Sequence, residues 1–144
     1  MKKFDPKIFS NQPFCQKIEK PWGWEILWTK PGKPYTGKII HILAGRRLSL
    51  QWHDQKEESM YLLTGQAKII WENNQGEMIE TAMEEGKGYS ICLGQKHRLA
   101  GITDCDIVEV STPEIGTTYR LADDYQRADE TAEVRQSDNR GWKS

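Results

Sequence analysis

The stretch LSLQWHDQKEE, residues 48–58, gathers side chains that can bind a metal ion. Gln51 and His53 lie two positions apart, and residues two apart on a β-strand point to the same face of a sheet. Glu58 follows where a second strand is expected to begin, so its carboxylate can turn toward the same space. His97 comes after the turn residues GQK, at a junction between strands. Gln51, His53 and Glu58 can therefore share one metal ion, and a fourth ligand would come from one of the other two histidines, His41 or His97, of which His97 is better placed.

A site with imidazole, carboxylate and amide ligands but no sulfur suits one divalent ion. Zn²⁺, Mn²⁺ and Fe²⁺ accept such ligands, whereas Cu(I) prefers thiolate and thioether ligands. The neighbouring Glu57 is expected to be solvated. His41 is expected to be structural, because it lies within the apolar run KIIHIL and outside the other clusters.

The bulk composition describes one ordinary globular domain. The chain has 144 residues, 28% of them charged, and a formal net charge of −1. No overall electrostatic field therefore favours nucleic acid or an acidic membrane as a partner. Three scattered cysteines, at positions 15, 92 and 105, argue against a disulfide framework. We expect reduced thiols and a cytoplasmic protein, because the first twenty residues lack the apolar core of a signal peptide.

Short strands separated by glycine-containing turns are expected along most of the chain. Alternating or β-branched runs predict strands at 21–28, 38–43, 48–51, 59–65, 66–72, 77–82, 89–93 and 106–113. No helical pattern precedes residue 120, and the polar segment 121–144 is expected to hold a helical turn or two. This pattern is typical of an antiparallel sandwich or barrel.

The spacing of the predicted ligands resembles the two sequence motifs of the cupin family. In the first motif glutamine replaces one histidine, and the motif comprises Gly45, Gln51, His53, Glu58 and Gly65. In the second motif cysteine and glycine replace proline and asparagine, and the motif comprises Gly86, Cys92, Gly94, His97 and Gly101. The resemblance implies that Gln51, His53, Glu58 and His97 are the metal ligands. It also implies an all-β, single-domain cupin jelly-roll β-barrel with a short polar C-terminal extension. It divides the chain into an N-terminal extension (1–20), a cupin domain (21–127) and a polar tail (128–144).

A closer resemblance is to the cupin module of type II mannose-6-phosphate isomerases, which forms the C-terminal part of bifunctional mannose-1-phosphate guanylyltransferases. It covers residues 18–127 through the segments PWGWEIL, AGRRLSLQWH, GQKHRL and YRLADDYQR. Glutamine is typical of that family at the first metal position, in agreement with Gln51. Further histidines of the family are replaced here by Asp54 and Gln55. No glycine-rich nucleotide loop occurs, so guanylyltransferase activity is not expected.

The resemblance implies a metal-dependent isomerase that interconverts mannose 6-phosphate and fructose 6-phosphate. It suggests zinc as the one divalent metal, with manganese or iron as alternatives. Such a reaction moves a proton between two carbons while charge develops on oxygen. Arg120 and Lys96 are the predicted catalytic residues, and the group that moves the proton is left open among a metal-bound hydroxide, Lys96 and Glu57. The predicted substrate-binding residues are Ser49, Arg46, Lys96 and Arg120. Of these, Lys96 and Arg120 are the main candidates to bind the phosphate.

Two other kinds of function are also compatible with the sequence. The chain can be a non-catalytic cupin that binds a sugar or a sugar nucleotide, or a metal-dependent epimerase or oxygenase, because one fold hosts many chemistries. The expected partner is a small sugar phosphate, with no nucleic acid and no membrane. A homodimer is expected as well, through apolar strands such as KIIHIL and through Trp52, which faces away from the predicted ligands.

Overall fold

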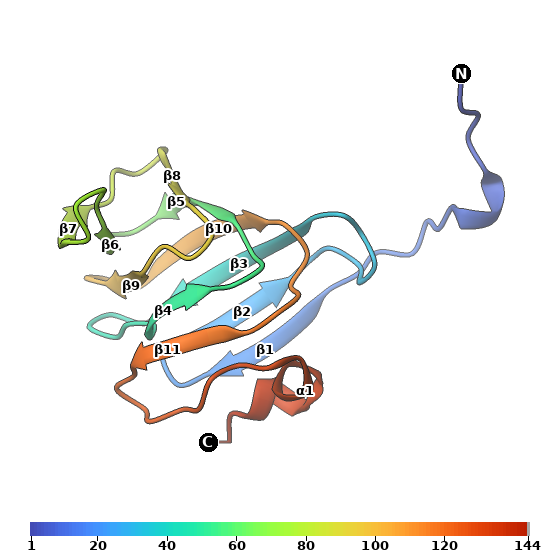
Figure 1. Cartoon of the computed structure of the whole chain (residues 1–144). Coiled ribbons are helices and arrows are strands. Elements are labelled where there is room, and N and C mark those ends of the chain that lie inside the picture. Colours follow the sequence, from blue (N-terminus) through green and yellow to red (C-terminus); the bar gives the residue numbers. More distant parts are fainter. Residues whose placement is uncertain (144) are drawn as a thin grey trace.

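The computed structural model describes residues 1–143, which form two antiparallel β-sheets packed face to face (Figure 1). The six-stranded sheet contains, in spatial order, β1 (Gln16–Lys20), β2 (Gly23–Leu27), β3 (Thr36–Ile42), β10 (Cys105–Ser111), β5 (Glu58–Thr64) and β8 (Gly88–Ile91). The five-stranded sheet contains β11 (Thr118–Ala122), β4 (Leu50–His53), β9 (His97–Gly101), β6 (Ala67–Glu72) and β7 (Met78–Ala82). The expected all-β, single-domain jelly roll is confirmed. Strand pairing does not close the two sheets into a barrel over residues 1–143, so the expected barrel is an open sandwich.

The apolar core lies between the two sheets and excludes water from one part of the sandwich. Side chains from both layers contribute to it, among them Trp22, Ile40, Ile42, Met60, Leu62, Ile69, Leu99 and Ile107. Alternation along each strand turns these residues inward while their neighbours face solvent. The core therefore stabilises the fold through burial of apolar surface contributed by both sheets.

Toward the other part of the sandwich, the inward-facing positions become charged. On β3 the inward series runs from Ile42 and Ile40 to Lys38, and on β10 it runs from Ile107 to Glu109. On β5 the series ends at Glu58, which is also buried. Because a buried charge is costly unless it is paired, such a layer needs partners inside the protein.

Several elements differ from the sequence-based expectation. β1 lies within the expected N-terminal extension and pairs with β2 along its whole length. β9 (His97–Gly101) occupies a stretch for which no strand was predicted. The helical turns expected in the C-terminal segment are α1 (Ala132–Gln136) and η2 (Asp138–Gly141), and a third short helix, η1 (Pro6–Ile8), precedes β1. No helix within residues 1–143 is both long and apolar enough to cross a bilayer.

A motif glycine explains one of the turns that bring the strands together. Gly65 lies between β5 and β6 with a φ of +87°, a left-handed conformation that side chains rarely adopt. A Cβ atom there would also collide with the backbone carbonyl of Asp104. The position therefore requires glycine, for a reason of backbone geometry rather than of metal binding.

Candidate metal centre and charged cavity

The register of the five-stranded sheet aligns three of the residues predicted from the sequence. Arg120 on β11 lies opposite Gln51 on β4, and Gln51 lies opposite His97 on β9. His53 is two positions beyond Gln51 and lies opposite Thr118. The sheet thus presents these side chains side by side, with both imidazoles turned into the sandwich, where each is buried.

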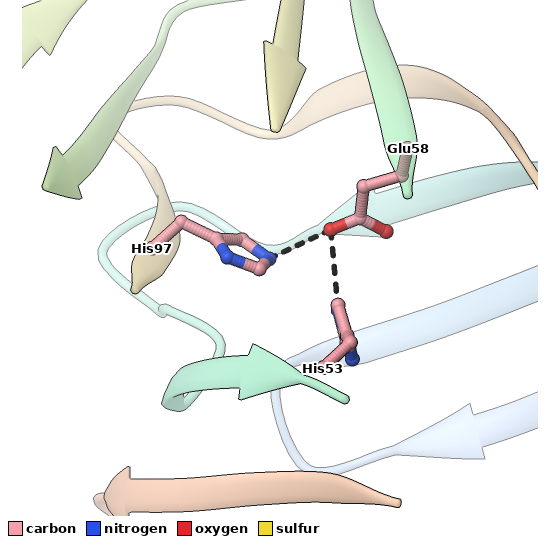
Figure 2. A group of neighbouring side chains, drawn as sticks. All are labelled: His53, Glu58 and His97. Atoms are coloured by element: carbon pink, nitrogen blue, oxygen red, sulfur yellow. Dashed lines mark hydrogen bonds and ion pairs between the residues drawn. The ribbon is translucent and has the colours of Figure 1, made fainter. Parts of the chain in front are cut away.

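Glu58 reaches the same point from the opposite sheet, as the first residue of β5 (Figure 2). Its Oε1 atom lies 2.6 Å from Nε2 of His97 and 3.3 Å from Nε2 of His53. One ligand atom from each of the three residues falls within 4.8 Å of the others, which is close enough for a single ion to contact all three. The structure therefore brings together three of the four predicted metal ligands in a buried cluster.

The outer nitrogen of each imidazole has its own partner. His97 Nδ1 lies 2.9 Å from the carbonyl oxygen of Gln95, to which it donates. His53 Nδ1 lies 2.9 Å from Oγ1 of Thr118. Such outer partners fix the ring orientation and leave Nε2 available for a metal ion.

The cluster also contains a polar atom that needs a cation. His97 Nε2 is fully buried and has no hydrogen-bond partner among residues 1–143, although it lies 2.6 Å from Glu58 Oε1. Because Nδ1 donates to the Gln95 carbonyl, Nε2 is the ring nitrogen that remains to bind a metal ion. A divalent ion between the two would satisfy both atoms, so the residues fit the metal that the sequence predicts.

Gln51, the fourth predicted ligand, borders the cluster. It lines the same small space as Glu58 and His97. Its Oε1 atom accepts a hydrogen bond of 2.8 Å from Oγ of Ser49. An amide oxygen has two lone pairs, so this bond leaves one available, and metal ligation by Gln51 stays a prediction.

Electrostatics keep the cluster ready to bind a cation. Burial lowers the pKa of His53, although Glu58 acts in the opposite direction, so the imidazole is neutral at pH 7. Burial by itself would raise the pKa of Glu58. The Lys56 ammonium and the hydrogen bond with His53 outweigh burial and hold the pKa of Glu58 well below its usual range.

Lys56 and Glu109 are parts of the site that the sequence analysis does not single out. The Lys56 ammonium is buried, 3.0 Å from Oε2 of Glu58 and 3.3 Å from Oε2 of Glu109. Burial and the nearby Glu58 raise the pKa of Glu109 to about 8, against the influence of Lys56. Strand alternation could have predicted that Glu109 faces inward, because it lies between the outward-facing Val108 and Val110. Lys56 lies in a loop, where no periodicity applies.

A charged cavity adjoins the cluster and includes His53 in its wall. Its volume is about 40 Å³, which is enough space for roughly three water molecules. Six cationic and four acidic side chains line it: Lys20, Lys38, Lys56, Arg120, Arg127 and Arg140, with Glu25, Glu109, Glu114 and Glu130. The excess of cationic side chains favours an anionic ligand.

The predicted substrate-binding residues separate into two groups. Arg120 and Ser49 line the cavity. Arg120 Nε is buried and has no hydrogen-bond partner in residues 1–143, although the same guanidinium donates to the Ala128 carbonyl and lies 3.5 Å from Oε2 of Glu130. Arg120 therefore keeps a free donor inside the protein.

Arg46, Lys96 and Glu57 do not reach the cavity. Arg46 is exposed and donates to the carbonyl oxygen of Pro21. Lys96 is 44% exposed, and its ammonium lies 3.6 Å from Oε1 of Glu72. Because Lys96 immediately precedes the inward-facing His97 on the chain, strand alternation directs it outward. Glu57 is exposed in the same way beside the buried Glu58.

His41 lies outside the site, in agreement with the structural role expected for it. Its ring stacks on Trp24 with centroids 4.1 Å apart, and Nδ1 lies 2.7 Å from Oδ1 of Asp106. All three side chains are at the outer face of the six-stranded sheet. His41 is thus a natural control for substitutions of the two buried histidines.

Comparisons with known proteins agree with this geometry. Residues 10–130 match the family described as mannose-6-phosphate isomerase C-terminal. No curated protein matches the chain. Its fold is similar to those of three solved structures that share less than a fifth of its sequence: oxalate decarboxylases from Lactobacillus farciminis (19% identity, TM-score 0.67) and Bacillus subtilis (17%, 0.67), and the capsular polysaccharide assembling protein CapF of Staphylococcus aureus (17%, 0.56).

These similarities cover most of this chain but only part of each larger protein. The match to the Lactobacillus farciminis decarboxylase covers 78% of this chain and 37% of that protein. The match to the Bacillus subtilis decarboxylase covers 78% of this chain and 33% of that protein, and the match to CapF covers 87% of this chain and 34% of that protein. The chain therefore spans about a third of the length of these structures. The Bacillus subtilis enzyme is described with Mn(II) centres, so this fold holds a metal in at least one relative.

Proposed function

The chain belongs to the family of mannose-6-phosphate isomerase C-terminal domains, and from this premise we propose that it is a metal-dependent sugar-phosphate isomerase. The proposed reaction interconverts mannose 6-phosphate and fructose 6-phosphate. The observation that carries the proposal is the buried cluster of His53, Glu58 and His97 beside a cavity with an excess of cations. A metal site and an anion-binding cavity are the two features that such a reaction needs.

The proposed metal is zinc, with manganese or iron as alternatives, and the proposed ligands are Gln51, His53, Glu58 and His97. A divalent ion bound there would stabilise negative charge on neighbouring sugar oxygens. Lys56 contributes by its position, because its ammonium holds Oε2 of Glu58 while Oε1 faces the imidazoles.

Arg120 is the proposed partner for the substrate's negative charge. Its buried Nε donor has no acceptor within the described part of the chain, and a guanidinium presents several donors in one plane to a phosphate. Ser49 supports the site by orienting Gln51. Arg46 and Lys96 are not part of this proposal, since both side chains lie at the surface.

The test is a metal analysis of the purified protein together with a coupled mannose 6-phosphate isomerase assay. His53→Ala and His97→Ala should each abolish bound metal and turnover, and His41→Ala should change neither. Full activity after complete chelation, or in His53→Ala, would exclude the metal mechanism.

The small cavity favours a second candidate, a non-catalytic cupin that binds a sugar or a sugar nucleotide. A space of about 40 Å³ is much smaller than the roughly 300–1,000 Å³ of typical ligand pockets, and both predicted side-chain bases lie outside it. Calorimetric binding of phosphorylated sugars without turnover would support this function. Oxygen consumption with Fe²⁺ would instead indicate an oxygenase. A homodimer and a cytoplasmic location stay predictions.

A further inference from the structure

The segment that follows Glu130 lies across the end of the sandwich next to β1 and β11 (Figure 1). It begins where the family match ends and includes α1 and η2. Neither helix contributes an apolar residue to the core. Polar contacts rather than apolar burial therefore dominate its attachment, which is typical of segments that open locally while the core stays folded.

Two arginines make most of these polar contacts. Arg135 donates to the backbone carbonyls of Glu114 and Gly116. Arg140 forms a two-pronged ion pair with Glu114, with both N···O distances at 2.7 Å, and a third contact of 3.2 Å with Oε1 of Glu130. The Arg140 side chain is only 7% exposed although it belongs to a surface segment. Arg140 therefore reaches from the segment into the charged cavity, whose wall it helps to form.

The backbone is strained at the point from which Arg140 enters. Asn139 and Arg140 have φ values of +47° and +51°, in the left-handed region that costs a non-glycine residue roughly 1–2 kcal/mol. Asn139 Oδ1 accepts a hydrogen bond of 2.9 Å from the backbone N–H of Glu19 on β1. This bond anchors the strained turn against the edge of the six-stranded sheet. The turn thus holds the guanidinium inward at a cost in backbone energy, as is typical of ligand clamps.

The Glu114–Arg140 pair separates two spaces. Both residues line the inner cavity of about 40 Å³ and also an outer groove of about 680 Å³. The groove is bordered by the loop that contains Lys30, Lys33 and Tyr35. A ligand that enters the cavity from the groove between these two residues would displace their ion pair.

We propose that segment 131–143 is a lid over the cavity and that Arg140 is its latch. The structure is the closed state, in which Glu114 and Glu130 hold the guanidinium. An anionic ligand entering from the groove competes with these carboxylates for Arg140, so the latch favours anions over neutral sugars. The identity of the ligand as a sugar phosphate rests on the proposed function, but the lid itself does not.

The test measures access to the cavity without any turnover. In a Cys15→Ser/Cys92→Ser background, Ser49→Cys puts a thiol on the cavity wall, and its reaction with an anionic methanethiosulfonate reagent is followed by peptide mass spectrometry. The buried Cys105, in the apolar core, reports global unfolding in the same molecule. Arg140→Ala should raise the reaction rate at position 49 at least tenfold and leave that of Cys105 unchanged.

Arg47→Ala is the matched control, because Arg47 also forms a two-pronged pair with a carboxylate, Asp124, but at the exposed surface. It should leave the rate at position 49 unchanged, and Arg140→Lys should give an intermediate rate. An unchanged rate in Arg140→Ala, or equal acceleration by Arg47→Ala, would overturn the lid. Since no catalysis is needed, failure of the isomerase assay and failure of the lid are separate results.

Discussion

The Nδ1 atom of His53 lies 2.9 Å from the hydroxyl oxygen of Thr118, directly across the β4–β11 pair. This contact fixes the ring so that Nε2 faces Glu58. Thr118→Val keeps the shape of the side chain but removes the hydrogen bond. We expect metal affinity to fall roughly 10–100-fold, as is usual when such an outer partner is lost.

Competition against a chromophoric chelator measures that affinity. Thr118→Ser, which retains the hydroxyl, serves as the control and should bind metal like the wild type. Equal affinity of the valine and serine variants would show that the hydroxyl does not orient His53.

The second prediction concerns the buried ammonium of Lys56. Lys56→Met leaves Glu58 and Glu109 without the cation that both contact. Loss of one partner from a buried ion pair typically costs about 3–5 kcal/mol, so urea denaturation should show a decrease of that size. Lys68→Met removes an exposed pair with Glu80 and should cost less than about 1 kcal/mol. Similar losses in both variants would contradict the structural importance of Lys56.

The third prediction is a loss of stability in acid. Burial by itself raises the pKa of Glu25, but Lys38 and Lys20 outweigh burial and lower that pKa from 4.5 to about 2. A carboxyl whose pKa is lower in the folded state stabilises the protein above its unfolded pKa and loses this effect as pH falls toward the folded value. Glu25 should therefore contribute about 3 kcal/mol near pH 7, which is lost between pH 4.5 and pH 2.

Denaturant titrations at several pH values test this dependence. Glu25→Gln should flatten the free energy of unfolding over the acid range, whereas substitution of an exposed carboxyl in Glu85→Gln should leave the slope intact. An unchanged slope in Glu25→Gln would assign the acid sensitivity to other groups, such as Glu114, whose pKa is also held low by Lys38 and Arg140 against burial.

The fourth prediction concerns added metal. An ion that binds only the folded state stabilises it by about 2.7 kcal/mol when its free concentration is a hundred times its dissociation constant. Thermal unfolding with Zn²⁺ should show this gain for the wild type and for His41→Ala, but not for His97→Ala. A gain in His97→Ala would place the binding site elsewhere.

The sequence could predict the centre of the site but not its surroundings. His53, Glu58 and His97 follow from motif spacing, because strand alternation and turn length determine where they point. The same alternation, applied to Lys96, shows why that residue lies outside. Lys56 has no such signal, because the antiparallel pairing of the distant strand β10 with β5 places Glu109 near it.

Some elements of the fold likewise could not be predicted from local sequence patterns. β1 has a mixed sequence, QKIEK, in which Ile18 and Lys20 both face inward. The burial of Lys20 depends on Glu130, 3.8 Å away and distant along the chain. Arg140 is a similar case, because its side chain contacts Glu114 and Glu130, which are distant along the chain.

Glu58 belongs to one sheet, whereas His53 and His97 belong to the other. An ion bound by all three would connect the two layers, which strand pairing within residues 1–143 does not close into a barrel. Metal content would then set the stiffness of the sandwich at this end, and metal loss would let the layers spread apart. A reaction at this site would then depend on how closely the bound ion holds the two sheets together.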